Sequence, residues 1–106
     1  MAWDIKYHPL AYEELQQLDG SVKIMVLKGI QKVSENPKPQ SEGGYGKPLG
    51  NQNGNNLTGL LKIKFLRIGI RVVYKLVENP ETKEMYILVI SLRADSEVYD
   101  IAGRRK

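Results

Sequence analysis

The N-terminal third of the chain begins with a strand pattern and continues with two helical patterns. Apolar and polar side chains alternate over residues 3–7, which predicts a half-buried strand. Pro9 ends this alternation and suits the first position of a helix. Apolar side chains then recur on one helical face over residues 9–18 and again over 21–35, with Asp19-Gly20 between the two segments. Because this connection is short, the two helices are predicted to form an antiparallel hairpin.

The C-terminal half is dominated by strand patterns. Three segments rich in β-branched residues, at 57–66, 70–77 and 84–92, are separated by short turns, which predicts a three-strand antiparallel meander. Residues 96–106 are predicted to be a strand end followed by a short helix. Together these elements predict an α+β domain in which the helical hairpin packs on one face of a single sheet and at least part of the other face is open.

Residues 36–57 have no periodicity and are rich in Gly, Asn, Gln and Pro, so we expect a long mobile loop there. The length of 106 residues suits one domain, spanning residues 1–106. The absence of cysteine excludes disulfides and thiolate zinc sites. The N-terminus lacks the apolar segment of a signal peptide, and the longest apolar run, Met85–Ile90, is too short to span a membrane. We therefore expect a soluble cytoplasmic protein that contacts no membrane.

The positive charge of the chain is concentrated in its C-terminal half. Residues 1–57 hold six basic and six acidic residues, whereas residues 58–106 hold ten and six, so the whole net charge of +4 lies in the second half. Clustered Lys and Arg are the electrostatic footprint of a polyanion binder. One stretch without acids carries five of these bases: Lys62, Lys64, Arg67, Arg71 and Lys75.

The strand pattern places part of this charge on one face. Lys62 and Lys64 point the same way because side chains alternate along a strand. The pairing that brings the basic faces of the two strands together sets Lys64 opposite Arg71 and Lys62 opposite Val73. Like charges that face each other destabilise a sheet by roughly a few tenths of a kcal/mol, so this face suits an anionic ligand. The alternative is a solvated basic face that only protects the sheet from aggregation.

Such a face suits RNA cleavage by the neighbouring 2′-hydroxyl. This reaction needs a base, stabilisation of the phosphorane and an acid for the leaving oxygen. Neighbouring cations lower the pKa of a lysine by disfavouring its charged form, and Lys64 lies between Lys62 and Arg71. We therefore interpret Lys64 as the base. Arg93, at the end of the third strand, is the candidate acid, and Tyr99 is placed to orient a substrate base.

Other catalytic solutions find little support. His8 is the single histidine, which excludes a two-histidine ribonuclease mechanism. The acidic residues, at 13–14 and 78–84 for example, do not form a metal-ligand pattern. We therefore expect no metal and no cofactor.

Several segments of the chain resemble the RelE branch of the RelE/ParE toxin superfamily. The Gly-x-Arg-Val-Val-Tyr motif at 69–74 is shared across the superfamily, whereas the Lys-x-Lys pair at 62–64, Arg93 and the terminal Ser-Glu-Val-Tyr are more typical of RelE. The N-terminal strand and helical hairpin agree in order and length, so the resemblance covers nearly the whole chain. The matching segments are Lys47-Pro48-Leu49, Leu57 to Lys64, Gly69 to Tyr74, Ser91-Leu92-Arg93 and Ser96 to Tyr99.

The resemblance implies a RelE/ParE-like, microbial RNase-like fold and the toxin of a type II toxin–antitoxin system. Such toxins enter the ribosomal A site and cleave mRNA by 2′-hydroxyl attack, leaving a 2′,3′-cyclic phosphate and inhibiting translation. The implied partners are the ribosome with its mRNA and rRNA, and a RelB-like antitoxin that wraps the toxin and often displaces its C-terminal helix. The implied enzyme is a metal-independent endoribonuclease.

By position in the family motifs, Lys62 and Arg71 would stabilise the phosphorane, Lys64 would be the base and Arg93 the acid. Tyr99 would stack on and orient the substrate and share in base catalysis. Further basic residues are expected to bind RNA or the ribosome: Arg67, Lys75, Arg104, Arg105 and Lys106.

Two departures from the family pattern stand out. The loop at 50–56 is longer than usual, and Ala94-Asp95 stand where relatives are often more basic, so we expect Asp95 to weaken phosphate binding. Two other functions stay open. One is a ParE-like inhibitor of DNA gyrase, which needs no catalytic face, and the set of Lys62, Lys64, Arg93 and Tyr99 argues against it. The other is a degenerate member that only binds RNA or its antitoxin.

Overall fold

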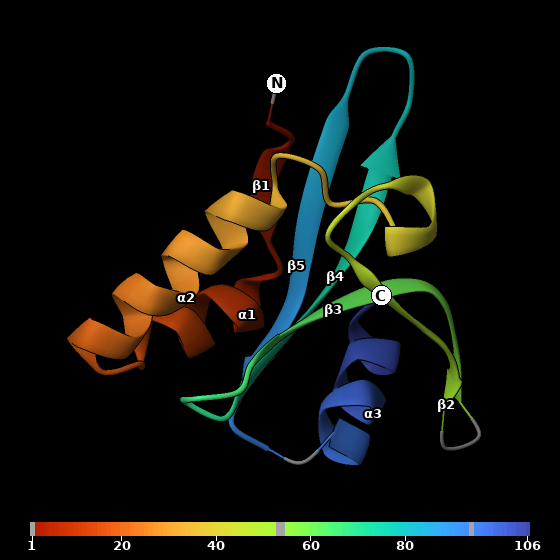
Figure 1. Ribbon diagram of the computed structural model, residues 1–106. Helices are drawn as coiled ribbons and strands as arrows, with labels where there is room; N and C mark the ends of the chain where they lie inside the picture. The colour runs from red at the N-terminus through yellow and green to blue at the C-terminus, as the bar shows by residue number, and fades with distance from the viewer. Residues whose placement is uncertain (1, 53–54, 94) are drawn as a thin grey trace.

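Five strands form a single sheet in the computed structural model, which describes residues 2–52, 55–93 and 95–106 (Figure 1). The strands are β1 (Asp4–Tyr7), β2 (Lys47–Gln52), β3 (Asn55–Phe65), β4 (Ile70–Glu78) and β5 (Lys83–Ser91), in the spatial order β1-β5-β4-β3-β2. The helices are α1 (Pro9–Gln16), α2 (Gly20–Val33), the 3-10 turn η1 (Gln40–Glu42) and α3 (Asp95–Arg105). None of the described helices is long and apolar enough to cross a membrane.

The meander of β3, β4 and β5 is the part of the sheet that the sequence predicts best. Both pairs are antiparallel, as expected from their short connections. Lys64 lies opposite Arg71 and Lys62 lies opposite Val73, so the predicted register is confirmed. β1 forms a parallel pair with the outer edge of β5, although both helices of the hairpin and three strands lie between β1 and β5 in the chain. The predicted α+β class is confirmed.

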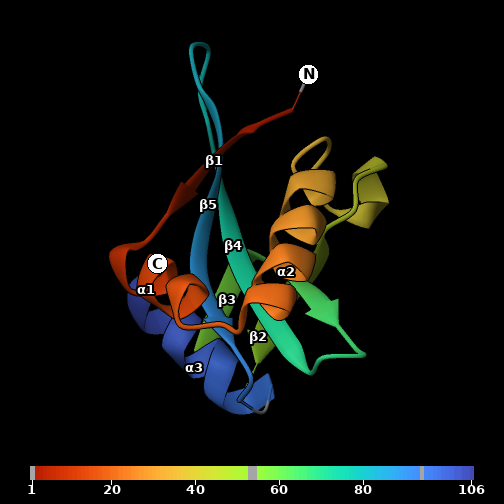
Figure 2. The ribbon, with the colours of Figure 1, turned by 90° about the vertical axis from the view of Figure 1, so that its left-hand side faces the viewer.

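The helical hairpin packs on one face of the sheet, as predicted (Figure 2). Leu15 of α1 and Val26 and Ile30 of α2 are buried there, because these residues recur on the inner side of each helix. On the sheet they meet the side chains of Val72 and Ile87, among others. This cluster is the larger of the two apolar cores found among the described residues.

The opposite face of the sheet is partly covered by α3 (Figure 1). Val98, Tyr99 and Ala102 are buried there in a second apolar core, which includes Leu60 of β3 and Val73 of β4. The expected open face is therefore confined to the area beyond α3. The covered area matters for function because the side chains of Lys62 and Lys64 lie on this same face.

The expectation of a structureless loop over residues 36–57 is wrong for part of that range. Gln40–Glu42 form a 3-10 turn, and Lys47–Gln52 form the edge strand β2, which pairs with β3. Pro48 and Gly50 are poor strand formers, so this strand depends on its partner rather than on its own propensity. Residues 53–54 lie outside the described residues, and the mobility of the segment stays a prediction.

A buried tyrosine fixes the segment that leads into β2. The Tyr74 hydroxyl donates a hydrogen bond to the Pro37 carbonyl oxygen at 2.8 Å. A Cβ atom at Gly46 would collide with the Tyr74 hydroxyl and the Leu61 side chain, so only glycine fits there. Burial raises the pKa of Tyr74, which keeps the phenol protonated as a donor. The entry to β2 is thus attached to the main core.

Candidate functional site

The basic face lies on the side of the sheet that α3 covers. Leu61 is buried in the core under α1 and α2, and Ile63 packs against that core. Because side chains alternate along β3, Lys62 and Lys64 project to the α3 side, where both are half-buried. The predicted separation of apolar and basic faces therefore holds in the structure.

Lys62 contacts Tyr99, which comes from α3. The Nζ atom of Lys62 donates a hydrogen bond to the Tyr99 hydroxyl oxygen at 3.0 Å, and it lies 5.5 Å from the centre of the tyrosine ring. Tyr99 is only 4% exposed because the second core surrounds its ring. Packing of α3 thus places the Tyr99 hydroxyl against Lys62 on the basic face.

Arg71 is anchored at the end of β5. Its Nη1 atom donates to the Arg93 carbonyl oxygen at 2.9 Å and to the Gly69 carbonyl oxygen at 3.3 Å. Lys64 lies opposite Arg71 in the ladder, and both line a small cavity of about 70 Å³ beside the turn between β3 and β4. The hydrogen bond to the carbonyl oxygen of Arg93 therefore connects the guanidinium of one predicted site residue to the backbone of another.

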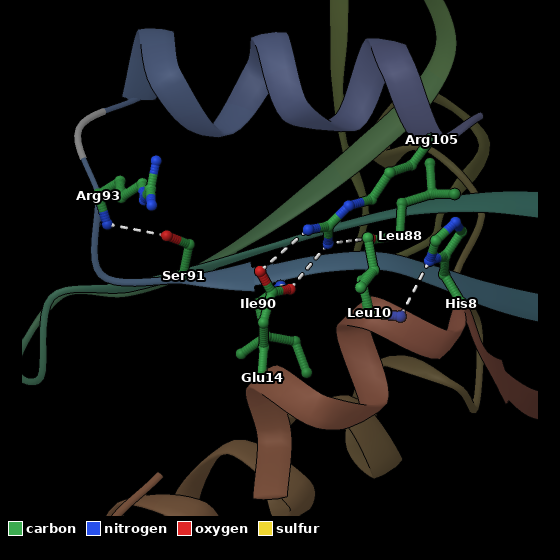
Figure 3. Close-up of polar contacts among 8 residues, drawn as sticks. All are labelled: His8, Leu10, Glu14, Leu88, Ile90, Ser91, Arg93 and Arg105. Atoms are coloured by element: carbon green, nitrogen blue, oxygen red, sulfur yellow. Dashed lines mark hydrogen bonds and ion pairs between the residues drawn. The ribbon is translucent and has the colours of Figure 1, made fainter. Parts of the chain in front are cut away.

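The Arg93 side chain is turned toward α3. Its Nη1 atom lies 3.8 Å from Oε2 of Glu97, and the two side chains are 64% and 61% exposed. An exposed pair with this spacing contributes about 0–1 kcal/mol, so it opens easily. The backbone N–H of Arg93 donates to Ser91 Oγ at 3.0 Å (Figure 3). The structure therefore holds the backbone of Arg93 firmly and its guanidinium loosely.

The five residues of the predicted catalytic set fall into two groups, and the members of each group are in contact or lie opposite each other. Lys62 and Tyr99 form one contact, while Arg71 and the backbone of Arg93 form another, with Lys64 opposite Arg71. The guanidinium of Arg93 is paired with Glu97 instead. Ala94 lies outside the described residues, and the side chain of Asp95 is not described, so the expected effect of Asp95 stays a prediction.

The predicted RNA-contacting residues are scattered. Lys75 lies on the basic face with its Nζ atom 5.2 Å from the ring centre of Tyr86, and Arg67 is exposed in the turn after β3. Arg104 and Lys106 are exposed near the end of α3. These positions stay candidate contacts to a large RNA rather than to one phosphate.

Arg105 has a different environment from the one expected. Its guanidinium contacts both carboxylate oxygens of Glu14 and the Leu88 carbonyl oxygen, and its side chain is 14% exposed (Figure 3). Nearby, His8 Nδ1 accepts the Leu10 N–H at 3.1 Å and caps α1, which gives the single histidine a structural role. The contacts of Arg105 argue against the RNA-binding role expected for it.

Lys47 is a basic residue of this face that the sequence reasoning did not include. It lies in β2 directly opposite Lys62, and it is exposed. Directly opposite residues in an antiparallel pair project to the same face. The sequence pattern predicts a loop over residues 36–57 and so assigns Lys47 to no sheet face, although Lys47-Pro48-Leu49 is one of the matching family segments.

Metal chemistry has no visible support in this arrangement. Within the described ranges, no three His, Asp or Glu side chains gather in a group that could hold a metal ion. The row of basic side chains formed by Lys62, Lys64 and Arg71, here called the basic row, offers hydrogen-bond donors and positive charge, which suit phosphate oxygens.

Similarity to known proteins extends over nearly the whole chain. A curated Escherichia coli protein named as a RelE-like toxin is 26% identical over 105 residues, which cover 99% of this chain and 98% of the relative. No protein-family model matches the chain.

Solved structures share the fold. A mutant of the E. coli toxin RelE in the free state matches with a TM-score of 0.72 at 24% identity, over 99% of this chain and 98% of RelE. The intact E. coli RelBE toxin–antitoxin complex matches with a TM-score of 0.66 at 19% identity, over 88% of this chain and 99% of the matched chain. The RelBE2 toxin–antitoxin complex of Mycobacterium tuberculosis gives a TM-score of 0.65 at 22% identity, over 90% and 95%. These structures confirm the predicted fold, and the curated relative bears out the resemblance to RelE.

Proposed function

We propose that this chain, which has the RelE fold and resembles RelE-type toxins over nearly its full length, is the toxin of a type II toxin–antitoxin system. In this proposal it is a ribosome-dependent, metal-independent endoribonuclease that cleaves mRNA in the ribosomal A site. The observation that carries the proposal is the convergence of Lys62 and Tyr99 beside the facing pair of Lys64 and Arg71. These groups provide the charge and the proton transfer that 2′-hydroxyl attack requires.

Each catalytic residue has a proposed role that follows from its position. Lys64, which lies opposite Arg71 in the ladder, removes the proton from the 2′-hydroxyl. Lys62 and Arg71 stabilise the negative charge that develops on the phosphorane. The Tyr99 ring is buried, which argues against the expected stacking on the substrate, and the hydroxyl that contacts Lys62 is the group proposed to orient it. Arg71 enters the reaction already ordered, because two backbone carbonyls hold its guanidinium.

Arg93 is the proposed acid for the leaving 5′-oxygen. In the unbound protein its guanidinium rests against Glu97, at a distance of 3.8 Å. A phosphate on the basic face offers this guanidinium a more highly charged partner than one exposed carboxylate. Substrate binding would therefore draw Arg93 from Glu97 to the scissile phosphate, while its anchored backbone serves as the pivot.

Residues around the reacting phosphate would hold the rest of the RNA. Lys47 extends the basic row onto β2 and is the proposed contact to a neighbouring phosphate of the mRNA. Arg67, Lys75, Arg104 and Lys106 remain proposed contacts to ribosomal RNA. Arg105 is left out of this set because Glu14 and Leu88 bind its guanidinium.

The proposed partners follow from the same reading. Relatives with this fold have been solved in toxin–antitoxin complexes, which supports a RelB-like antitoxin as the regulator of this chain. The other partners would be the ribosome, its mRNA and its rRNA. The proposal therefore includes a cytoplasmic location, where these partners are found.

Induced expression followed by mapping of mRNA ends tests this function. The proposal predicts rapid arrest of translation and new mRNA ends within codons that occupied the ribosomal A site. A DNA damage response with intact mRNA would instead indicate a gyrase inhibitor. Absence of any growth effect would indicate a degenerate member that only binds RNA or its antitoxin.

A further inference from the structure

Glu14 of α1 and Arg105 of α3 form a two-pronged contact that also includes the backbone of β5. Nη1 of Arg105 lies 2.8 Å from Oε1 of Glu14, and Nη2 lies 3.2 Å from Oε2. Nη1 also donates to the Leu88 carbonyl oxygen at 2.9 Å, and Glu14 Oε1 accepts the Ile90 N–H at 3.1 Å. Figure 3 shows the guanidinium between Glu14 and the strand. We call this set of contacts the Glu14–Arg105 clasp.

The clasp forms where β5 extends beyond its parallel neighbour. β1 pairs with β5 only as far as Tyr7, which lies opposite Ile87. The last hydrogen bond between the two segments is donated by the His8 N–H to the Ile87 carbonyl oxygen. Beyond that point a register irregularity between β4 and β5 surrounds Leu88. Edge groups of a strand need partners when they are covered by other elements. Glu14 and Arg105 satisfy two of these groups, which links the pair to a fixed position on the sheet.

These contacts differ from an ordinary surface ion pair. The Arg105 side chain is 14% exposed and that of Glu14 is 27% exposed. A planar guanidinium that meets both oxygens of a carboxylate fixes direction as well as distance. A lysine would keep the charge of Arg105 but would lose this fork.

The clasp has a consequence for the proposed site because Arg105 and Tyr99 belong to the same helix. They are six residues apart, or roughly 9 Å along the helix axis. Val98, Tyr99 and Ala102 hold α3 to the sheet by apolar contact, which is non-directional and permits small shifts. The hydrogen bond from Lys62 to Tyr99 tolerates little displacement. A directional contact at the end of α3 would remove that freedom.

We propose that the Glu14–Arg105 clasp positions Tyr99 for its contact with Lys62, so that both clasp residues are positioning residues for the reaction. The proposal rests on the proposed endoribonuclease function where it concerns rate, but its structural part does not depend on that function. It predicts that damage to the clasp acts on the chemical step through Tyr99. A merely stabilising role would instead lower the amount of folded protein.

The experiment compares Arg105→Lys in two backgrounds, wild type and Tyr99→Phe. Single-turnover cleavage of ribosome-bound mRNA should fall about 10-fold for Arg105→Lys in the wild-type background at saturating protein, because a small misplacement of a reacting group is costly. In the Tyr99→Phe background the same change should have almost no further effect. Equal losses in both backgrounds would overturn the proposal. Lys23→Ala, which removes an exposed contact to Gln16 between α1 and α2, is the control and should retain full activity.

A second measurement keeps the structural part testable if the wild-type chain cuts no RNA. Nuclear Overhauser contacts between the Lys62 side chain and the Tyr99 ring should be present in the wild type and in Lys23→Ala. They should weaken in Arg105→Lys and in Glu14→Gln while thermal unfolding shows that both variants are folded. Unchanged contacts in the folded clasp variants would overturn the proposal, whereas lost contacts together with an inactive wild type would refute only the proposed function.

Discussion

The Nζ atom of Lys62 donates a hydrogen bond to the hydroxyl oxygen of Tyr99 at 3.0 Å, although the two residues are 37 positions apart in the chain. The contact joins the centre of β3 to α3 across the face where the basic side chains lie. Tyr99→Phe removes the accepting oxygen and keeps the ring. We expect cleavage of ribosome-bound mRNA to slow roughly 10- to 100-fold, because a small misplacement of a reacting group is costly. Thermal unfolding should change little, because the ring stays in the second core.

This prediction is checked by single-turnover kinetics with wild-type protein as the reference. Wild-type rates in folded Tyr99→Phe would show that the hydroxyl has no part in the reaction. A fall in rate that matches the fall in folded protein would assign Tyr99 to stability alone.

Lys47→Ala should weaken RNA binding without much effect on the chemical step. Lys47 lies opposite Lys62 on β2, at the margin of the basic row, and is exposed. Loss of one phosphate contact reduces the slope of log affinity against log salt by about 0.7 for a single strand. The slope can be measured by titrating labelled single-stranded RNA at several salt concentrations. Lys28→Ala removes an exposed lysine from α2, on the other side of the sheet, and should leave the slope unchanged; equal slopes for both variants would exclude Lys47 from the site.

Gly46→Ala should destabilise the fold. An added Cβ would collide with the Tyr74 hydroxyl and the Leu61 side chain in the main core. Overpacking of this kind costs about 1–3 kcal/mol, which lowers the unfolding temperature by several degrees. Gly20→Ala is the matched control, because a Cβ at Gly20 meets nothing within 4 Å. The packing account of residues 37–46 would be wrong if both variants unfolded at the same temperature.

Alkaline pH should weaken the wild type more than Tyr74→Phe. Burial raises the pKa of Tyr74 above its ordinary value of 10.0, so the unfolded chain ionises first as the pH rises. The stability that this group contributes is therefore complete below its unfolded pKa and is lost as the pH rises through its folded pKa. Denaturant titrations at about pH 9 and about pH 11 should show a larger loss of unfolding free energy for wild type than for Tyr74→Phe. Parallel losses would show that Tyr74 is not protected in the folded state.

Local periodicity predicted much of the fold and of the basic row. The register that sets Lys64 opposite Arg71 follows from alternation along two strands that are joined by a tight turn, and the structure has that register. The position of Tyr99 was within reach as well, because the resemblance to RelE includes its motif. In both cases the information lies within a few neighbouring residues.

The features that were missed depend on distant partners. β2 contains Pro48 and Gly50, which are poor strand formers, and β3 provides its hydrogen bonds. The local sequence pattern therefore does not predict this strand. Lys47 was lost from the site together with that strand. Glu14 and Arg105 are 91 positions apart, and a basic residue at the end of a helix is typical of a solvated terminus. Only the folded chain, in which both side chains reach the backbone of β5, reveals their contact.

In the proposed mechanism, the basic side chains cleave mRNA on the ribosome without a metal ion or a histidine. Cleavage of mRNA on purified, stalled ribosomes, with chemical identification of the new 3′ ends, tests this mechanism, because 2′-hydroxyl attack leaves a cyclic phosphate. We predict 2′,3′-cyclic phosphate ends for wild type and for Lys28→Ala, and rates lower by about 100-fold or more for Lys64→Ala and for Arg93→Ala. Wild-type rates in either of the last two variants, or intact mRNA with the wild-type protein, would rule out this mechanism.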